Sequence, residues 1–386
     1  MLLVGDDPAL LAAALEEGLG ADLCVISGGL GPTHDDRTVE LLARATGRRL
    51  VVDAALEGEI EQVARDVAAR LERPYADFEP GVRKQASLPE GAQSLGLAGT
   101  APAVLLEHER GVAVALPGPP GELRRLWPAA LASEEMRKVL ERAPAPAHRI
   151  LRFFGPSESA VARALDEAGG ERDGLAVTVC AANLEIQVDL YWSAKSAGEG
   201  AAVAGALRDR FGDELFAEDE RGVADLVVEA CRGRGYTLAT AESCTGGLVA
   251  TRLTAVPGSS EIFLGAIVAY ADEVKRGQLG VPGEMLERHG AVSAEAARAM
   301  AAGARAALKA DVAVAVTGIA GPGGGSEAKP VGLVHVVATS PEAEIERELR
   351  LPGDREEVRA RATAVSLHAL RGVLTQTGTH SRAVSS

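Results

Sequence analysis

The segment at 236–254 constrains the fold of the last third of the chain more than any other feature of the sequence. It begins with an apolar run that favours a strand, and its last residues place leucine and valine on one face of a helix. Between the two lie Ser243, Cys244, Thr245 and the pair Gly246–Gly247. A strand that enters a helix through small residues leaves backbone N–H groups free at the start of the helix, where an anion can bind. Two interpretations follow: the commoner one, a hydroxyl that caps the helix, and a nucleophile beside an oxyanion site.

Length and composition bound the class of protein. The chain has 386 residues, which predicts two or three domains. Its formal net charge of −15 argues against a large nucleic-acid surface and against binding to anionic lipid. No stretch approaches the roughly 20 apolar residues of a membrane span, and the N-terminus lacks a signal-peptide pattern. With four scattered cysteines and no zinc-type spacing, we expect a cytoplasmic protein whose partners are small molecules, not nucleic acid or membrane.

The alternation of apolar and helical runs predicts a multidomain α/β chain. Residues 1–142 show it from the apolar run at 1–4 onward, as in a doubly wound α/β domain. Residues 143–220 open on an Ala/Pro-rich linker at 143–147 and then read as a small α+β unit without recognisable chemistry. Residues 221–386 predict an α/β/α domain around the segment described first.

A glycine-rich turn follows the buried-strand run at 21–27. Its candidate binding residues are Gly28, Gly29, Gly31, Thr33, Asp35 and Asp36. A second strand run at 112–116 ends in Pro117 and Gly118, a rigid loop that we expect at the same sheet edge, where ligands of doubly wound domains bind. Either the turn is a plain one with an aspartate capping the next helix, or it is a nucleotide site whose aspartates hold a divalent metal.

Three later features supply further polar groups. Lys275 follows the apolar run at 262–270 by a few residues, and a desolvated lysine there could act as a base toward a nearby hydroxyl. The loop at 317–325 has five glycines within nine residues and strand runs on both sides, so we expect an anion-binding loop inside one domain and not a linker. Arg355, at the start of the last helix, could contact a phosphate. Together they predict an amide or ester hydrolase of the Ser–Lys type.

Six motifs of the last third occur in the order expected of the CinA family. They lie at 242–247, 256–260, 270–275, 289–293, 317–322 and 352–355. This part is similar to the family's C-terminal nicotinamide mononucleotide deamidase module (PncC-like). The turns at 28–36 and 117–120 resemble its molybdopterin-binding-like N-terminal domain, which is associated with a metal-dependent ADP-ribose pyrophosphatase activity.

The resemblance implies an amidohydrolase that converts nicotinamide mononucleotide to nicotinate mononucleotide and ammonia. Ser243 would be the nucleophile, Lys275 its base, and the amides around Thr245 and Gly246 the oxyanion site. The residues implied to line the substrate site are Tyr270, Thr317, Gly318, Gly321 and Gly323, with Arg355 at the phosphate. This reaction would need no cofactor, and Cys244 would be structural, although a thiolate nucleophile is the chemical alternative.

For the N-terminal domain the resemblance implies a nucleotide such as ADP-ribose and a divalent metal (Mg, Co or Mn), with Asp36 as the candidate ligand. It also implies a homodimer.

The sequence departs from the family's pattern at two points. Asp272 stands where the family usually has Asn, and a carboxylate beside Lys275 favours the charged lysine, which predicts a more alkaline rate optimum. Family members also carry a strand–helix–strand ahead of the position of residues 4–7. We therefore expect an N-terminal domain that lacks an interior sheet element. The alternative function for that domain is a non-catalytic pterin- or nucleotide-binding module.

Overall fold

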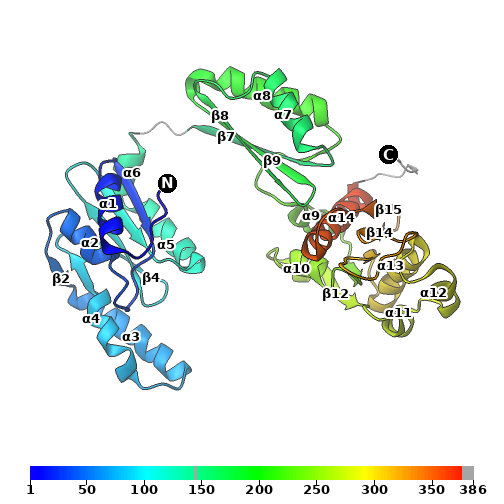
Figure 1. The fold of residues 1–386 in the computed structure, drawn as a ribbon, viewed down its shortest axis with the longest axis horizontal. Coiled ribbons are helices and arrows are strands. Elements are labelled where there is room, and N and C mark those ends of the chain that lie inside the picture. The colour runs from blue at the N-terminus through cyan, green and yellow to red at the C-terminus, as the bar shows by residue number, and fades with distance from the viewer. Residues whose placement is uncertain (143–145, 376–386) are drawn as a thin grey trace. The chain divides into compact units, whose positions relative to one another are not determined.

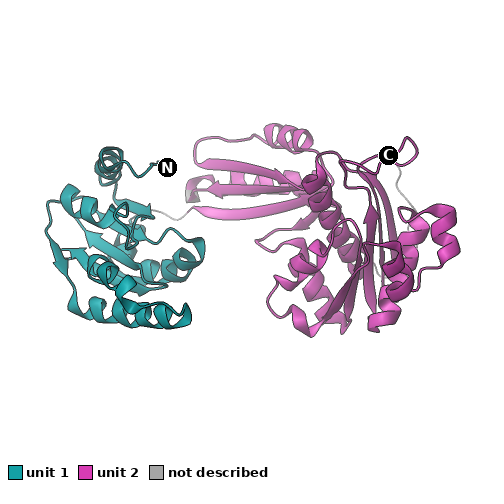
Figure 2. Cartoon of the chain, turned by 60° about the horizontal axis from the view of Figure 1, so that its bottom comes forward, with its two compact units in different colours: residues 1–145 teal, residues 146–386 magenta. Residues whose placement is uncertain are grey.

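The computed structural model describes residues 1–142 and 146–375. The chain divides into two compact units, one within residues 1–145 and the other within 146–386 (Figure 2). The expected multidomain α/β architecture is confirmed, and the predicted linker at 143–147 begins in residues outside those described. The segment predicted as a small α+β unit belongs to the second unit, where it forms a sheet of its own. No helix in the described ranges is long and apolar enough to cross a membrane.

The first unit is a four-stranded sheet flanked by helices, with the strand order β1-β6-β5-β4 (Figure 1). Strands β1 and β6 are parallel, and the other pairs are antiparallel. The strands of this sheet are β1 (Leu23–Ser27), β4 (Gln93–Leu97), β5 (Pro102–Glu107) and β6 (Val112–Leu116), and β2 (Leu50–Val52) pairs with β3 (Ser87–Pro89). The helices are α1 (Pro8–Gly18), α2 (Thr38–Ala45), α3 (Ala54–Arg70), η1 (Tyr75–Asp77), α4 (Glu79–Gln85), α5 (Pro120–Ala132) and α6 (Glu134–Leu140).

The start of the first unit corrects one expectation. The apolar run at 1–4 forms no strand, and Met1, Leu2 and Leu3 are exposed. A strand is stabilised by a neighbour that pairs with its backbone, and no neighbouring strand pairs with this run in the described part of the chain. Helix α1 begins where the sequence predicts, because Asp7 accepts hydrogen bonds from the first-turn amides and proline occupies the first helical position.

The second unit contains two sheets. The first is antiparallel with the order β10-β7-β9-β8. Its strands are β7 (Ala147–Phe154), β8 (Leu175–Ala182), β9 (Glu185–Trp192) and β10 (Leu215–Ala217), and its helices are α7 (Glu158–Glu167), η2 (Ala194–Ser196) and α8 (Ala197–Phe211). Strand β9 alternates as predicted, so Val188 and Leu190 are buried in the core against Val161 of α7 and Leu207 of α8.

The other sheet has the order β12-β11-β13-β14-β15, with the first three strands parallel and the last two antiparallel to their neighbours. Its strands are β11 (Leu238–Glu242), β12 (Phe263–Val268), β13 (Val312–Gly318), β14 (Leu333–Thr339) and β15 (Glu344–Arg350). The helices are α9 (Val223–Arg234), α10 (Leu248–Thr254), η3 (Ser259–Glu261), α11 (Asp272–Leu279), α12 (Gly283–His289), α13 (Ala294–Leu308) and α14 (Arg355–Thr375).

Helices cover both faces of this five-stranded sheet. Leu238 of β11 packs in a core with α9 and α14, whereas its neighbour Ala239 packs in the core formed with α11, α12 and α13. Successive side chains of a strand point to opposite faces, so the two cores follow from the alternation of β11. Ser293 caps α13 as predicted, accepting from the N–H of Ala296 at 3.2 Å. The carboxyl ends of β11, β12 and β13 lie at one edge, which brings the turns after these strands together.

Helix α14 packs against both sheets of the second unit. Its His368 is buried, stacks on Phe154 of β7 with 3.7 Å between ring centroids, and lies edge-on to Phe216 of β10. A carboxylate oxygen of Glu185 lies 2.7 Å from Nε2 of His368. The predicted α+β segment is therefore joined to the last helix of the chain by a buried aromatic and polar contact.

Candidate active site

The turn after β11 has the predicted strand–turn–helix form. Residues 243–247 connect β11 to α10, and the N–H of Ser243 donates to the carbonyl of Val316 on β13 at 2.9 Å. Gly246 and Gly247 have φ angles of 62° and 101°. This left-handed backbone favours glycine, which explains the two adjacent glycines of the turn.

The amides at the start of α10 are held by Glu242, a residue that the sequence analysis did not single out. Its carboxylate is fully buried and accepts from the N–H groups of Gly247 (2.9 Å), Val249 (3.1 Å) and Ala250 (2.9 Å), and from the hydroxyl of Thr245 (2.7 Å). The expectation that the first-turn amides are open to a ligand is therefore wrong for these three groups. The available signal was an acidic residue directly after an apolar strand and before a helix, where a carboxylate satisfies free N–H groups.

Ser243 and Lys275 line one cavity of about 270 Å³. The predicted residues that also line it are Tyr270, Thr317, Gly318, Gly321, Gly323 and Arg355. Thr245 and Gly246 do not line it: the Thr245 hydroxyl donates to Glu242, and the Gly246 N–H donates to the Ser243 carbonyl at 3.1 Å.

Lys275 is almost completely buried, with 1% of its surface exposed. Its Nζ donates to the Tyr270 carbonyl at 3.1 Å and to Oδ1 of Asp272 at 3.2 Å. A buried ammonium group requires such partners. Asp272 is thus in contact with the lysine, as the sequence predicts, and the alkaline rate optimum stays a prediction. Within the described residues no hydrogen bond joins Lys275 to the Ser243 hydroxyl, and such catalytic bonds often form only in the substrate complex.

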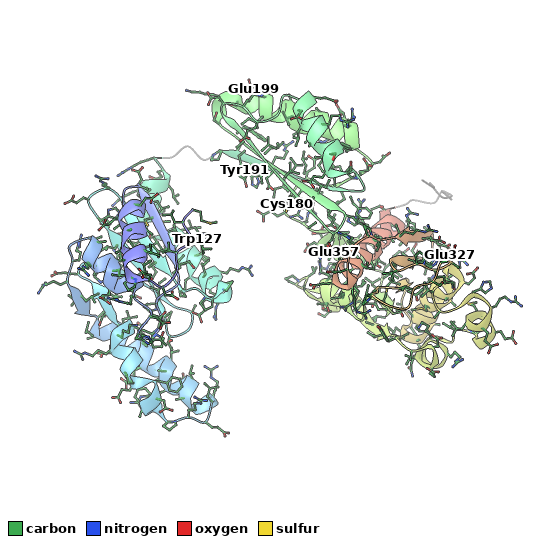
Figure 3. The ribbon with its side chains drawn as sticks, viewed as in Figure 1. Trp127, Cys180, Tyr191, Glu199, Glu327 and Glu357 are labelled. Carbon is green, nitrogen blue, oxygen red and sulfur yellow. The ribbon has the colours of Figure 1, made fainter. Side chains whose placement is uncertain are left out.

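Cys244 is the alternative nucleophile, and its surroundings oppose that role. Burial raises the pKa of Cys244 to about 11, against the smaller, opposite effect of the Cys244 and Thr245 amides. A thiol with this pKa is protonated near neutral pH, and the thiolate is the nucleophilic form. Its side chain packs in the core between the sheet and α14. By contrast, Cys180 on β8 is exposed (Figure 3).

Arg355 connects two sides of the cavity. One guanidinium nitrogen donates to the Gly321 carbonyl at 2.7 Å and the other to the Tyr270 hydroxyl at 2.8 Å. Thr317 is 1% exposed and donates to the carbonyl of Ala291 at 2.8 Å, so its hydroxyl already has an acceptor. The glycine-rich loop after β13 and the first turn of α14 therefore meet at this cavity, as the motifs predict.

Two further basic residues hold the walls of this site, and the sequence analysis missed both. Arg359 of α14 donates to the carbonyls of Cys244 at 3.1 Å and Thr245 at 2.9 Å. Lys329 donates to the carbonyls of His289 and Val292, both at 2.6 Å, and so attaches the loop after β13 to the segment before α13. These partners are distant in sequence, so no local pattern could have indicated them.

The N-terminal turn also forms at the predicted sheet edge. Because β1 and β6 are parallel neighbours, their turns meet: the Gly28 N–H donates to the Leu116 carbonyl at 2.9 Å. A Cβ on Gly118 would lie 3.4 Å from the Cα of Gly28, which is a tight contact. Gly29 has a φ angle of 69°, and a Cβ there would lie 2.3 Å from the Thr38 hydroxyl. The segments containing Gly28 and Pro117 thus approach each other as expected.

Polar side chains of this turn bond to the turn itself. The Asp36 carboxylate accepts from the N–H (3.0 Å) and the hydroxyl (2.5 Å) of Thr33, and Lys84 donates to the Thr33 carbonyl. A Cβ on Gly31 would lie 2.4 Å from the same carboxylate, which accounts for that glycine. Asp35 is exposed.

The expected divalent metal does not fit these side chains. Within the described residues no three His, Cys, Asp or Glu side chains converge as a metal site. Asp36, the candidate ligand, is bonded within its own turn. No chemical step through a metal follows from this turn.

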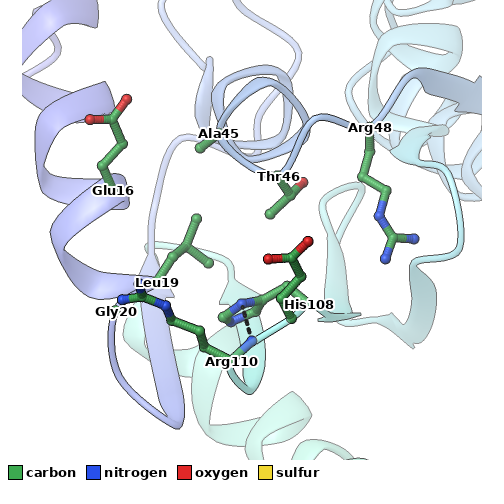
Figure 4. A pocket seen from close by; sticks show the side chains of 9 residues that line it. Glu16, Leu19, Gly20, Ala45, Thr46, Arg48, His108 and Arg110 are labelled. Atoms are coloured by element: carbon green, nitrogen blue, oxygen red, sulfur yellow. Dashed lines mark hydrogen bonds between the residues drawn. The ribbon is translucent and has the colours of Figure 1, made fainter.

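Another cavity of the first unit contains none of the predicted residues. It measures about 480 Å³ and is lined by Glu16, Leu19, Gly20, Ala45, Thr46, Arg48, His108, Glu109 and Arg110 (Figure 4). Arg48 donates to the carbonyls of Glu90 and Glu107, and the two arginines of the lining are matched by two glutamates. The lining thus offers no surplus of charge toward an ionic ligand.

Comparison with known proteins covers both units. Residues 220–374 match the CinA C-terminal domain, and residues 1–137 match the probable molybdopterin binding domain. A CinA-like protein of Mycolicibacterium paratuberculosis is 44% identical over 391 residues, 97% of this chain and 89% of the relative. One of Mycolicibacterium vanbaalenii is 43% identical over 383 residues, 97% of this chain and 90% of the relative.

A solved structure, the competence/damage inducible protein CihA from Agrobacterium tumefaciens, is 41% identical and covers 40% of this chain and 98% of its own, with a TM-score of 0.39. The similarity to the curated relatives extends over nearly the whole chain. The chain belongs to the CinA family.

Proposed function

We propose that the second unit hydrolyses the carboxamide of nicotinamide mononucleotide to nicotinate mononucleotide and ammonia. The observation that carries the proposal is that Ser243 and Lys275 come from different elements and line one cavity together with Arg355. The high pKa of Cys244 leaves the serine as the better nucleophile of the turn.

In this reaction the Ser243 hydroxyl attacks the carboxamide carbon while neutral Lys275 takes its proton. The tetrahedral intermediate collapses, and the same proton passes from Lys275 to the departing nitrogen, which leaves as ammonia. Water then attacks the acyl-serine ester with Lys275 again as the base. The products are nicotinate mononucleotide and the free serine.

The two cavities beside Arg355 indicate which end of the substrate lies next to Ser243. Its volume of about 270 Å³ is near the lower limit of ligand sites, which measure about 300–1,000 Å³, so we expect it to hold the nicotinamide end of the nucleotide. An adjoining cavity of about 560 Å³ shares Ala320 and Arg355 but is also lined by Asp354 and Glu356, which disfavour a phosphate. We therefore expect the phosphate on the side of Arg355 that faces the cavity of Ser243, along the glycine-rich loop after β13.

The decisive experiment compares ammonia release from nicotinamide mononucleotide by the wild type, Ser243→Ala and Cys244→Ala. Ser243→Ala should lower kcat by about 10⁴-fold or more, as removal of a serine nucleophile does in serine hydrolases. Cys244→Ala removes only a buried side chain and should keep kcat within about 3-fold. Activity that survives in Ser243→Ala, or a wild type that releases no ammonia, would refute the proposal.

For the first unit we propose a non-catalytic pterin- or nucleotide-binding module, with ADP-ribose pyrophosphatase as the competing activity. The favouring observation is that Thr33, Asp36 and Lys84 bond within the turn where a metal-dependent reaction would need free ligands. ADP-ribose should bind, as measured by calorimetry, without hydrolysis when Mg²⁺, Mn²⁺ or Co²⁺ is added. Metal-dependent release of AMP would establish the enzyme instead.

A further inference from the structure

Two charged side chains hold the turn of Ser243, and the proposed reaction uses neither of them. Glu242 accepts hydrogen bonds from the amides that follow the turn, and Arg359 donates to two of the turn's carbonyls. Because neighbouring side chains of a strand alternate, Glu242 and Ser243 point to opposite faces of the sheet. The turn is thus held from the side of α10 and α14, while its serine lines the cavity at the carboxyl ends of the strands.

Arg359 bonds two successive peptide groups. Its Nε donates to the Cys244 carbonyl at 3.1 Å, and a terminal guanidinium nitrogen donates to the Thr245 carbonyl at 2.9 Å. The planar fork of the guanidinium, with donors at fixed positions, suits two such bonds at once. In a trans peptide the N–H points away from the C=O, so these bonds direct the amides of Thr245 and Gly246 away from Arg359.

The N–H groups of this turn already have partners of their own. The Gly246 N–H donates to the Ser243 carbonyl, and those of Gly247, Val249 and Ala250 donate to Glu242. The N–H of Thr245 lies against the Cys244 thiol, and Thr245 is fully buried and does not line the cavity. What the turn presents at the cavity is therefore the side chain of Ser243, whose position depends on how the turn is held.

We propose that Arg359 is a positioning residue for the amide hydrolysis, which holds the turn so that Ser243 keeps its place at the cavity. This inference rests on the proposed function of the second unit. Arg359 would touch neither the substrate nor the reacting atoms, and its effect would pass through the two carbonyls that it binds.

Steady-state kinetics of full-length Arg359→Gln and Arg359→Lys tests the role. Misplacement of a catalytic group by about 1 Å can cost about 10²-fold in rate, so Arg359→Gln should lose about 10²-fold in kcat with KM within about 3-fold of the wild type. Arg359→Lys should recover about 10-fold of that loss, because an ammonium can still donate to these carbonyls but lacks the planar, fixed fork of the guanidinium. Arg252→Gln, an exposed arginine on α10, is the matched control and should match the wild type. Unchanged kcat in Arg359→Gln, or an effect confined to KM, would overturn the inference.

Hydrogen exchange supplies a readout that does not depend on substrate. In Arg359→Gln, amides 243–250 should exchange about 10-fold faster or more, while peptides of β13 and the second half of α14 keep their rates. If α14 as a whole also exchanges faster, Arg359 only anchors the helix and the inference fails. A wild type that releases no ammonia would refute the proposed function and with it a role in amide hydrolysis. Faster exchange confined to the turn in Arg359→Gln would still show that Arg359 holds the turn, and unchanged exchange would overturn the inference whatever the activity.

Discussion

The turns after β1 and after β11 are built from the same kinds of residue but use them differently. Both follow a strand, contain glycines with positive φ, and combine a threonine with a carboxylate. After β1 the carboxylate of Asp36 belongs to the turn itself and accepts from Thr33 beside it. After β11 the carboxylate of Glu242 belongs to the last residue of the strand and points to the opposite face from Ser243.

The difference shows what keeps a glycine-rich turn available for chemistry. The second turn is held by groups on the far face of the sheet, so the side chain of Ser243 is left facing a cavity. The first turn is held by its own side chains, which leaves fewer of them for a ligand. The two turns therefore differ mainly in where the carboxylate lies relative to the end of the strand. The number of glycines matters less to whether side chains of the turn stay available.

The largest test of this comparison uses the lysine that lies near each turn: Lys275 of α11 at the cavity of Ser243, and Lys84 of α4 at the turn after β1. Lys275→Met should lower ammonia release by about 10³-fold, because it removes the proposed general base while keeping a side chain of similar length. Lys84→Met, which removes the lysine that holds the first turn, should leave ammonia release unchanged within about 2-fold. Kinetics with nicotinamide mononucleotide measures both. Comparable losses in the two variants would show that the turns are not functionally distinct.

A second test compares the two carboxylates that hold the turns. Glu242→Gln leaves buried amides without a charged acceptor and should lower the free energy of unfolding of the second unit by about 2–4 kcal/mol. Asp36→Asn affects a partly exposed group and should cost the first unit less than about 1 kcal/mol. The exchange rates of the most protected amides in each unit report these values separately. Equal costs would contradict the distinction drawn here.

The smallest expected effect concerns pH and the helix that holds the second turn. Burial lowers the pKa of His368 below its unfolded value of about 6.5, against the opposing effect of Glu185, and Arg371 lowers it further. The second unit should therefore have its full stability above pH 6.5 and lose stability as the pH falls from there to the lowered pKa. The loss should be about 1.4 kcal/mol for each pH unit that separates the folded and unfolded pKa values.

His368→Gln keeps a hydrogen-bond donor for Glu185 but does not titrate, so this part of the pH dependence should disappear. Urea unfolding at pH 7.5 and 5.5 measures the change. His335 is also buried with a lowered pKa. If stability still depends on pH in His368→Gln, the same measurement on His335→Gln shows whether His335 causes the remainder. A slope unaltered by His368→Gln would show that this histidine is not the titrating group.

The sequence predicts the local elements well and the long-range polar contacts poorly. Apolar runs and glycines locate β11, β13 and their turns, and the serine at 293 locates the start of α13, because these signals depend on neighbouring residues. The roles of Glu242 and Arg359 depend on which face of the sheet each approaches, and Arg359 meets carbonyls more than one hundred residues away. The prediction of a strand at 1–4 is wrong for a related reason, because apolar residues form a strand only beside a strand that pairs with them.

Helix α14 has a mechanical consequence for this protein. Arg359, which bonds the turn of the proposed nucleophile, and His368, which stacks on Phe154, lie nine residues apart on one helix, a separation of about 13 Å at 1.5 Å per residue. A continuous α-helix of this length is stiff, so a displacement of one end moves the other end with little bending of the helix. The β7–β10 sheet would then support the distant serine turn through α14.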